Sequence, residues 1–561
     1  LAALFFAVYP GYSWWVSAIE YQPMIASLAL QTLSIALTWR AVLARSRAEK
    51  TACLAASLLT GWAYIALVDY AIGMEAFRFI GVFILVNRGA GRSLWRGILH
   101  ALRALGWGLL IPLGFAVWRL FFFENQRAAT DIGAQLGALA ENPASTTVNW
   151  LLQIYNSLVN LAVQAWLNQF PAFLQEMRLR DLAVGVLFTG GALLLLALFE
   201  KRIEDASGFD RDRLRSEALT LGGLGMFFGI LPVVMANRYV NVGGFSHYGL
   251  PASLAAGLFM AAVLDMVSMK KARSVLLYIL LSFAILAHYG IAVRALQEQK
   301  ALQEFWRQVS WRAPAIREGT TLVLYYPLPG LGDDDFGVME AANVLYFPNP
   351  TGQIPVHYPL AGLTLNERTL PDILNAPPLR ETKYRSHTVT FDYDNLLVMS
   401  QPAPYSCVHV MDGSQPLIST LDPIETALAA PKSKIENVIL DAAFVVPPRA
   451  VYGGEPARNW CYYFQKADLA AQSGDWERVV SLGEEALRLQ FSPDDRVEWM
   501  PFLKAYAVTG RAEQLKTTAK RVVGEKALRI QACAMLSAIE EPLTPEVREV
   551  IAAAYCKTKA Q

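Results

Sequence analysis

A set of ionisable side chains near the ends of long apolar segments could together carry out acid–base and phosphate chemistry. A carboxylate can take a proton from a hydroxyl, and an arginine can hold phosphate through parallel hydrogen bonds. Charge is costly inside a bilayer, so such side chains usually pair with one another or serve a function. The carboxylates Asp69 and Glu75 are therefore candidate catalytic residues, and candidate phosphate-binding residues are Arg78, Arg119 and Arg238. A purely structural alternative, in which acid–arginine pairs fix helix ends, remains open.

No other motif indicates a known chemistry. The sequence lacks the HExxH, P-loop and GxSxG patterns, so zinc proteases, P-loop NTPases and α/β-hydrolases have no support. Four further side chains lie in or near strand-like runs: His387, Asp392, Asp394 and His409. Strand alternation alone does not place them on one face, and no metal site is predicted.

The elements that must position these residues are membrane spans. Of the 561 residues, 54% are hydrophobic and only 17% are charged, and the mean hydropathy is +0.30. Soluble proteins carry about 25% charged residues. The apolar segments cluster in residues 1–293, which predicts an integral membrane protein whose partner is the lipid bilayer. The formal net charge of +1 gives no electrostatic case for a nucleic-acid partner.

We predict about nine spans in an α-helical membrane domain, residues 1–293, because a helix needs about 20 apolar residues to cross. The segments are 1–9 (truncated), 24–43, 52–70, 74–87, 101–122, 182–199, 218–236, 249–268 and 274–293. Basic residues concentrate in alternate loops, as the positive-inside rule predicts. This alternation stays in phase only if the short segment 74–87 crosses the membrane. It places residues 294–561 outside the cytoplasm.

Two outer segments have distinctive patterns. In 149–170, Asn and Gln recur every three to four residues between apolar side chains, which predicts an amphipathic helix in the outer interface. The first outer loop, from Tyr9 to Pro23, is rich in aromatic residues. It is either an interfacial aromatic belt or a wall for a lipid or sugar ligand.

The second half predicts an extracytoplasmic α+β domain followed by helices. A junction at 294–319 continues the last span as a helix that Pro314 ends. Trp306 and Trp311 are expected in the interfacial belt, and Arg307 and Arg312 are expected to face phosphate head groups or the helix end. Strand-like runs in 320–455 predict a sheet-containing domain. In 456–561, Gly474 and Gly510 begin similar segments 36 residues apart. That spacing is close to the ~34 residues of a tetratricopeptide repeat, a helix pair that binds peptides or packs on other domains.

The cysteines and the first residue add two expectations. None of the five cysteines forms a CxxC pair, and unpaired buried thiols are the favoured interpretation. A disulfide between Cys407 and Cys461 stays open. The sequence begins at Leu1, inside an apolar run and without Met, so we expect further residues upstream.

The chain resembles GT-C-like membrane glycosyltransferases of the dolichyl-phosphate-mannose-protein mannosyltransferase type. It is more specifically similar to uncharacterised bacterial multi-pass proteins with a tetratricopeptide-like tail. The motifs that carry this similarity are Tyr9-Pro10-Gly11, Asp69-Tyr70 with Glu75 and Arg78, Trp311-Arg312-Ala313-Pro314, and Gly474-Asp475-Trp476. The pattern departs where an arginine would precede the tyrosine near Leu250: here the pair is His247-Tyr248.

This resemblance implies a glycosyltransferase that uses a polyprenyl-phosphate-linked sugar at the outer face of a bacterial plasma membrane. A divalent metal is an expected cofactor of such an enzyme. The alternative is a non-catalytic scaffold in the membrane whose external sheet and repeat modules bind envelope proteins. A transporter is less favoured, because the spans lack the midplane charges and paired broken helices of transporters.

Overall fold

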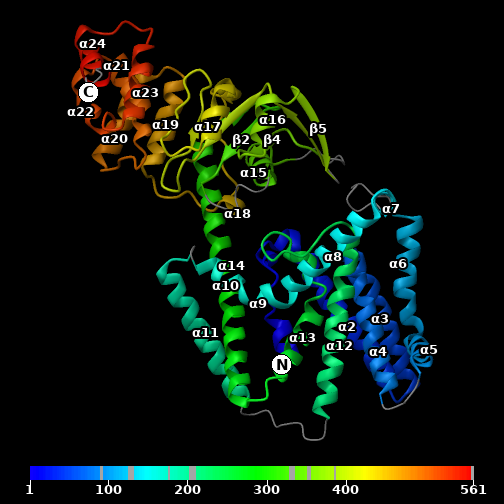
Figure 1. The fold of residues 1–561 in the computed structure, drawn as a ribbon. Helices are drawn as coiled ribbons and strands as arrows, with labels where there is room; N and C mark the ends of the chain where they lie inside the picture. Colours follow the sequence, from blue (N-terminus) through cyan, green and yellow to red (C-terminus); the bar gives the residue numbers. More distant parts are fainter. Residues whose placement is uncertain are drawn as a thin grey trace. The chain divides into compact units, whose positions relative to one another are not determined.

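The computed structural model describes residues 1–88, 93–123, 132–174, 177–200, 210–327, 335–349, 356–384 and 387–556. The chain divides into two compact units, Leu1–Leu296 and Gln297–Gln561. Both predicted regions, a helical membrane part and a smaller part that contains β-strands, are present (Figure 1).

In the described residues, the regular elements of the first unit are helices (Figure 1). Its elements are α1 (Ala2–Ala7), η1 (Trp14–Val16), α2 (Ala18–Leu43), α3 (Arg47–Leu67), η2 (Asp69–Gly73), α4 (Met74–Asn87), α5 (Leu94–Leu105), η3 (Gly106–Leu109), α6 (Leu110–Phe121), α7 (Ile132–Glu141), α8 (Pro143–Val159), η5 (Asn160–Gln164), α9 (Ala165–Leu167), α10 (Gln169–Leu174), α11 (Leu179–Glu200), α12 (Arg211–Met235), η6 (Ser246–Gly249), α13 (Ser253–Asp265) and α14 (Lys270–Arg312). The last helix, α14, continues into the second unit.

Six helical segments among the described residues are long and apolar enough to cross a membrane, which identifies an integral membrane protein. They are Tyr21–Leu43, Arg47–Leu67, Leu94–Phe121, Leu179–Leu198, Arg211–Met235 and Lys270–Arg312. The predicted spans at 1–9, 74–87 and 249–268 correspond to shorter helices, α1, α4 and α13. The 14 residues of α4 extend about 21 Å at 1.5 Å per residue, against a hydrocarbon core of about 30 Å. The count of nine spans therefore stays a prediction.

Ion pairs bring the basic ends of several helices in this unit together. Arg88, after α4, binds Glu217 in the first turns of α12. Arg211 at the start of α12 and Arg273 at the start of α14 both bind Asp265 at the end of α13. Four helix ends that the positive-inside pattern assigns to one side are thus linked by direct contacts.

The amphipathic segment predicted at 149–170 is helical, running through α8, η5, α9 and into α10. It lies across the longer helices (Figure 1). Its amide side chains hold the loop that follows α12: Asn149 and Gln153 donate to Asn237 Oδ1 at 3.3 and 2.9 Å, and Ser157 Oγ accepts from Val240 N at 3.0 Å. The polar face of this segment therefore forms hydrogen bonds with side chains and backbone of the protein itself.

The second unit begins with the last turns of α14, and here the expected role of the junction is wrong. Trp306 is completely buried and Arg312 is 2% exposed. Arg307 donates to the carbonyl of Tyr452 at 3.2 Å, and Arg312 is paired with Asp468 and donates to Gln472 Oε1. These tryptophans and arginines stabilise the core of the unit instead of facing lipid head groups. The predicted end of the helix before Pro314 is confirmed.

The sheet-containing part is built on four strands in the order β4-β2-β7-β8. They are β2 (Thr321–Tyr325), β4 (Ala361–Thr364), β7 (Leu396–Ser400) and β8 (His409–Val410). β2 is parallel to both β4 and β7, and β8 is antiparallel to β7. Leu322 and Leu324 pack in one core cluster with α14 and with α15 (Phe336–Tyr346), whereas Val323 packs in a second cluster. This alternation is the two-residue period of a strand.

The other strands form two further sheets. One has the order β3-β6-β5 and the other pairs β1 with β9. The bounds are β1 (Ala315–Ile316), β3 (Val356–His357), β5 (Leu379–Tyr384), β6 (His387–Asp392) and β9 (Val438–Ile439). The remaining helices of this part are α16 (Leu370–Asn375), α17 (Ile424–Ala429), η7 (Ala430–Lys432), η8 (Ile435–Asn437) and α18 (Arg449–Tyr452).

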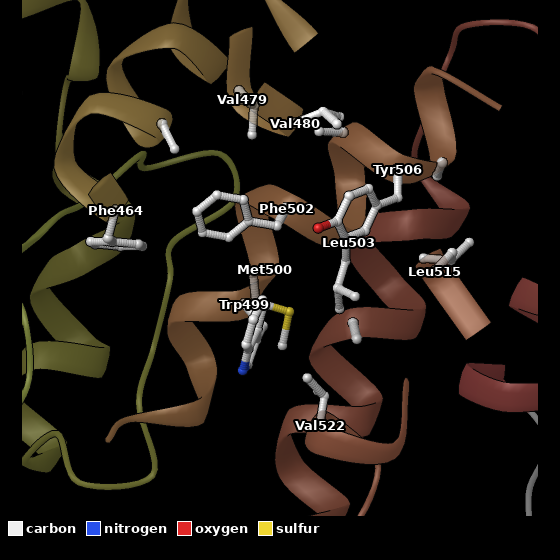
Figure 2. Close-up of a cluster of buried hydrophobic side chains, with 14 of the residues drawn as sticks. Phe464, Val479, Val480, Trp499, Met500, Phe502, Leu503, Tyr506, Leu515 and Val522 are labelled. Atoms are coloured by element: carbon white, nitrogen blue, oxygen red, sulfur yellow. The ribbon is translucent and has the colours of Figure 1, made fainter. Parts of the chain in front are cut away.

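The C-terminal part is helical, as its periodicity predicts. The helices are α19 (Trp460–Gln472), α20 (Trp476–Arg488), η9 (Arg496–Trp499), α21 (Met500–Val508), α22 (Ala512–Val522), α23 (Lys526–Ser537), α24 (Pro545–Val550) and η10 (Ile551–Cys556). Their shared core includes Phe464, Val479, Phe502 and Leu515 (Figure 2). Gly474 and Gly510 both have φ of +75° at the ends of helices, a conformation that favours glycine. Assignment to the tetratricopeptide family stays a prediction.

The cysteines of this unit are paired, so the favoured interpretation of unpaired thiols is wrong. Cys407 is bonded to Cys461 and Cys533 to Cys556. Cys53, in the first unit, is free. The sequence could not show this, because residues 54 apart were brought together by the packing of α19 beside β8.

Candidate functional site

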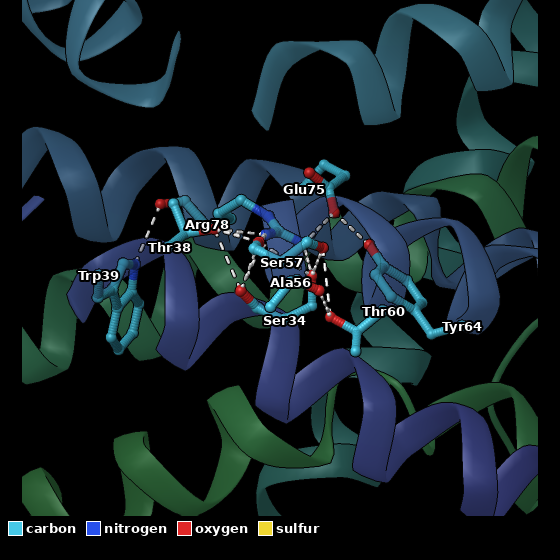
Figure 3. A network of polar contacts seen from close by, with 9 residues as sticks. All are labelled: Ser34, Thr38, Trp39, Ala56, Ser57, Thr60, Tyr64, Glu75 and Arg78. Atoms are coloured by element: carbon cyan, nitrogen blue, oxygen red, sulfur yellow. Dashed lines mark hydrogen bonds and ion pairs between the residues drawn. The ribbon is translucent and has the colours of Figure 1, made fainter. Parts of the chain in front are cut away.

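Glu75 and Arg78 lie in one buried polar network between α2, α3 and α4 (Figure 3). The Arg78 Nη1 group donates to Ser34 O at 3.0 Å, to Thr38 Oγ1 at 2.6 Å and to Ser57 Oγ at 2.7 Å. Its Nη2 group donates to Ser34 Oγ at 2.8 Å and to Glu75 Oε1 at 2.9 Å. The guanidinium end of Arg78 is therefore occupied by protein acceptors.

The carboxylate end of this network is buried as well, and one of its two oxygens is hydrogen-bonded. Glu75 Oε1 accepts a hydrogen bond from Tyr64 in addition to that from Arg78. Arg78 is 0% exposed and Glu75 is 7% exposed. Glu75 Oε2 and Arg78 Nε are buried without a hydrogen-bond partner among the described residues. Removing either member of a buried charge pair nevertheless leaves the other as an uncompensated charge. The geometry thus favours a structural role for Glu75 and Arg78, which fix α4 directly after the turn η2.

Asp69 and Arg119 form a second pair with a different environment. Arg119 Nη1 lies 3.6 Å from Asp69 Oδ2, and the two side chains are 16% and 46% exposed. That distance is longer than a hydrogen bond. The Arg119 guanidinium lies 3.8 Å from the ring centre of Phe123, and Asp69 Oδ1 accepts from Tyr70 N at 2.8 Å. The pair is accessible through Asp69, nearly half of whose side chain is exposed, whereas the Arg119 side chain is mostly buried.

Aromatic rings from three separate loops meet beside Asp69, and we call them the aromatic cluster. Its members are Trp14, Tyr21, Tyr70, Phe245, His247 and Tyr248. Tyr70 links the cluster to the acid–arginine pair: its ring lies 5.5 Å from that of Tyr248, and its hydroxyl donates to His247 O at 3.1 Å. Ser13 Oγ and Ser246 Oγ, 2.8 Å apart, join the first outer loop to the loop before α13.

The aromatic first loop also makes contacts within the protein. Its Tyr21 ring contacts the ring of His247, and Trp14 Nε1 donates to Gly244 O at 3.2 Å, so both reach residues more than 200 positions away in the sequence. Burial lowers the pKa of His247 to about 4, so this imidazole is neutral at pH 7. A cationic role for His247 in binding phosphate is not supported.

Arg238 follows the end of α12, in the loop held by α8. Its backbone N donates to Val233 O at 3.1 Å and its side chain is half-buried. The turn η2 packs against the same end of α12, where Gly73 faces Phe228 O and Pro232. Asp69 and Arg238 therefore belong to segments at one end of the unit, although no direct contact between their side chains is observed among the described residues.

The surface beside Tyr70 has little depth. A cavity lined by Met24, Gln31, Tyr70 and Pro251 is too narrow to admit a water molecule. Among the described residues, the groups of three or more potential metal ligands do not include Asp69. A ligand of this site would therefore lie on the aromatic cluster and the Asp69–Arg119 pair, at the surface.

Comparisons with known proteins leave the geometry as the basis for function. No model of a protein family matches the chain, no curated protein matches it, and no solved structure matches it.

Proposed function

We propose that the second unit lies on the extracytoplasmic side of a bacterial plasma membrane. The alternation of basic loops supports this orientation. The two disulfides, Cys407–Cys461 and Cys533–Cys556, support it independently, because disulfides persist in oxidising compartments and are rare in the cytosol. A C-terminal alkaline phosphatase fusion should be active and a C-terminal green fluorescent protein fusion dark. The opposite pair of results would contradict the orientation.

We propose further that the protein is a GT-C-like glycosyltransferase acting on a polyprenyl-phosphate-linked sugar at that face. The observation that carries the proposal is the accessible Asp69–Arg119 pair beside the aromatic cluster. An acid and an arginine that lie 3.6 Å apart can act on one substrate, the acid by accepting its proton and the arginine by binding its phosphate. Aromatic faces suit both a sugar ring and an isoprenoid chain.

In the proposed reaction an acceptor hydroxyl attacks the anomeric carbon of the sugar. The bond between that carbon and the phosphate oxygen breaks, and polyprenyl phosphate leaves with the bonding electrons. Asp69 takes the proton of the hydroxyl, and Arg119 balances charge on the leaving phosphate. Glu75 and Arg78 act as positioning residues, because their network fixes the helix that follows the Asp69 turn. Arg238 is a further phosphate-binding candidate from the neighbouring loop.

The experiment is a transfer assay with the full chain in nanodiscs. The probe is polyprenyl-phosphate-mannose labelled in the sugar, and the measured product is labelled sugar released to water or transferred to membrane acceptors. Wild type should turn over, and Asp69→Asn should lose more than about 100-fold in rate. Arg40→Gln, in the exposed pair with Glu49, is the matched control and should retain full rate. Absence of turnover in wild type, or equal rates in Asp69→Asn, would contradict the proposal.

A second candidate function, the scaffold that binds envelope proteins, has one observation in its favour. An open groove of about 530 Å³ lies between α23, α24 and η10, lined by Leu536, Ile539, Leu543 and Ile551 among others. Deleting 456–561 is not a usable test, because it removes Asp468 and Trp460 from the core of the unit. Ile539→Glu tests it instead: partners captured by the full chain should be lost while turnover of the mannose donor is kept.

A further inference from the structure

Three chemically matched side chains converge inside the second unit, away from the site described above. His409 is in β8, Asp495 precedes η9, and Glu498 lies within η9. Their exposed fractions are 1%, 4% and 1%. One possible ligand atom from each residue lies within 4.8 Å of the others. The sequence did not suggest this group, because the histidine and the carboxylates are more than 80 residues apart.

The imidazole of His409 is buried without satisfying its polar atoms. Neither ring nitrogen has a hydrogen-bond partner among the described residues. Nε2 lies 3.6 Å from Glu498 Oε1, which is too long for a hydrogen bond. Two ligand atoms bound at about 2.1 Å to one tetrahedral zinc ion lie about 3.4 Å apart. The observed separation is therefore close to that between two ligands of one metal ion.

The two carboxylates are already oriented by other groups, as metal ligands usually are. Glu498 accepts from Cys407 N at 2.7 Å and from Trp460 Nε1 at 2.6 Å. Asp495 accepts from Ser406 Oγ at 3.2 Å and from Val497 N at 3.3 Å. Each carboxylate oxygen has two lone-pair positions, so every oxygen retains one for a metal.

The charges of the group call for a cation. Two buried carboxylates face one imidazole, and a divalent ion would balance them, since buried charges are normally paired or bound to a metal. A proton can partly fill this role: burial favours neutral His409, but the nearby carboxylates of Glu498, Asp495 and Asp422 outweigh it and raise the pKa of His409. Metal and proton would therefore compete for the same imidazole.

We propose that His409, Asp495 and Glu498 bind a divalent transition-metal ion of the zinc type. An imidazole with two carboxylates favours such an ion over calcium or magnesium, which prefer oxygen ligands alone. A second carboxylate oxygen can complete four-fold coordination. The ion would join β8 to η9, and so the sheet-containing part to the helical part, beside the Cys407–Cys461 disulfide. This assignment is independent of glycosyl transfer at Asp69.

The test uses the full chain purified in detergent, treated with EDTA, and titrated with Zn²⁺ and Co²⁺ separately. Wild type should bind one ion per chain, show the visible absorption of four-coordinate Co²⁺, and gain thermal stability with Zn²⁺. His409→Ala should weaken Zn²⁺ binding by more than about 100-fold, because a ligand loss should exceed the 10- to 100-fold cost of losing an outer partner. His357→Ala, which replaces an exposed histidine of β3, is the control and should bind as wild type does.

Asp495→Asn keeps the oxygen that caps η9 and provides a second variant if His409→Ala fails to fold. It should fold without added metal and bind Zn²⁺ weakly. The proposal is overturned if wild type binds no metal, or if His409→Ala and Asp495→Asn bind as tightly as wild type. A wild-type stability that changes with pH and not with Zn²⁺ also overturns it, and leaves a buried histidine–carboxylate pair only.

Discussion

Two acid–arginine pairs begin six residues apart in the sequence and have opposite environments. Glu75–Arg78 is buried and its guanidinium end is bound by Ser34, Thr38 and Ser57. Asp69–Arg119 is partly exposed and its closest approach, 3.6 Å, is longer than a hydrogen bond. Residue type alone therefore does not separate a structural pair from a candidate site. What separates them is burial: Glu75 and Arg78 are 7% and 0% exposed, whereas the Asp69 side chain is 46% exposed.

The closed pair should be the more important one for stability. Arg78→Met leaves Glu75 as an uncompensated buried charge and three hydroxyl groups without their donor. We expect a loss of about 3–5 kcal/mol in the free energy of unfolding, measured by thermal or denaturant unfolding of the full chain in detergent. Arg88→Met, in the exposed pair with Glu217, is the control and should cost no more than about 1 kcal/mol. Equal losses in both variants would remove the distinction.

The open pair should be the more important one for turnover. Asp69→Asn should lower kcat more than about 100-fold by removing the proton acceptor. Arg119→Gln should chiefly raise KM for the polyprenyl-phosphate donor, because it removes the phosphate contact. Both variants should lose no more than about 1 kcal/mol in the free energy of unfolding, the upper range for a surface ion pair. Kinetics of the mannose-donor assay, with melting curves on the same samples, check this split. Loss of folding in either variant would place the open pair with the closed one.

Tyr64→Phe should reveal the closed network with a smaller effect. The substitution removes one of the two donors to Glu75 Oε1 and leaves Arg78 in place. A lost hydrogen bond to a charged group costs about 1.5–3 kcal/mol, and turnover should be unchanged once the protein is folded. A variant that is as stable as wild type would show that the Tyr64 hydrogen bond does not stabilise the network.

The weakest effect is expected from pH at the aromatic cluster. The pKa of His247 is lowered to about 4 in the folded chain, against about 6.5 unfolded. The unfolded chain therefore binds more protons, and stability should fall as pH drops from about 6.5 through 4. His247→Gln should reduce this dependence in melting curves recorded across that range. A dependence identical to that of wild type would assign it to other groups.

The sequence predicted several elements well, because their signals are local. The strand-like runs predicted within 320–455 include β2, β6 and β7, and the period of 149–170 predicts its helix. The pairing of β2 with β4 was not predicted, because parallel neighbours are set by the crossover through α15. The sequence predicts Trp306 and Trp311 at a membrane interface. Tryptophan beside arginine occurs both at interfaces and in protein cores, so this pattern does not distinguish the two.

One local signal for the closed network was present and missed. Polar residues recur every three to four positions along the apolar α2, and all are buried: Ser27, Gln31, Ser34 and Thr38. Such a stripe indicates an internal polar partner, here Arg78 for its last two members. The Asp69–Arg119 contact has no comparable signal, since it depends on how α6 packs against α3.

Binding of polyprenyl phosphate without its sugar tests the distinction between the two pairs most directly. The full chain in nanodiscs is titrated with polyprenyl phosphate, and melting temperatures are recorded for wild type, Arg119→Gln and Tyr64→Phe. We predict that Arg119→Gln binds more than about 10-fold more weakly with an unchanged melting temperature, as loss of one charge-assisted contact implies, whereas Tyr64→Phe binds normally and melts earlier. Normal binding by Arg119→Gln, or weak binding by a fully folded Tyr64→Phe, would contradict the account.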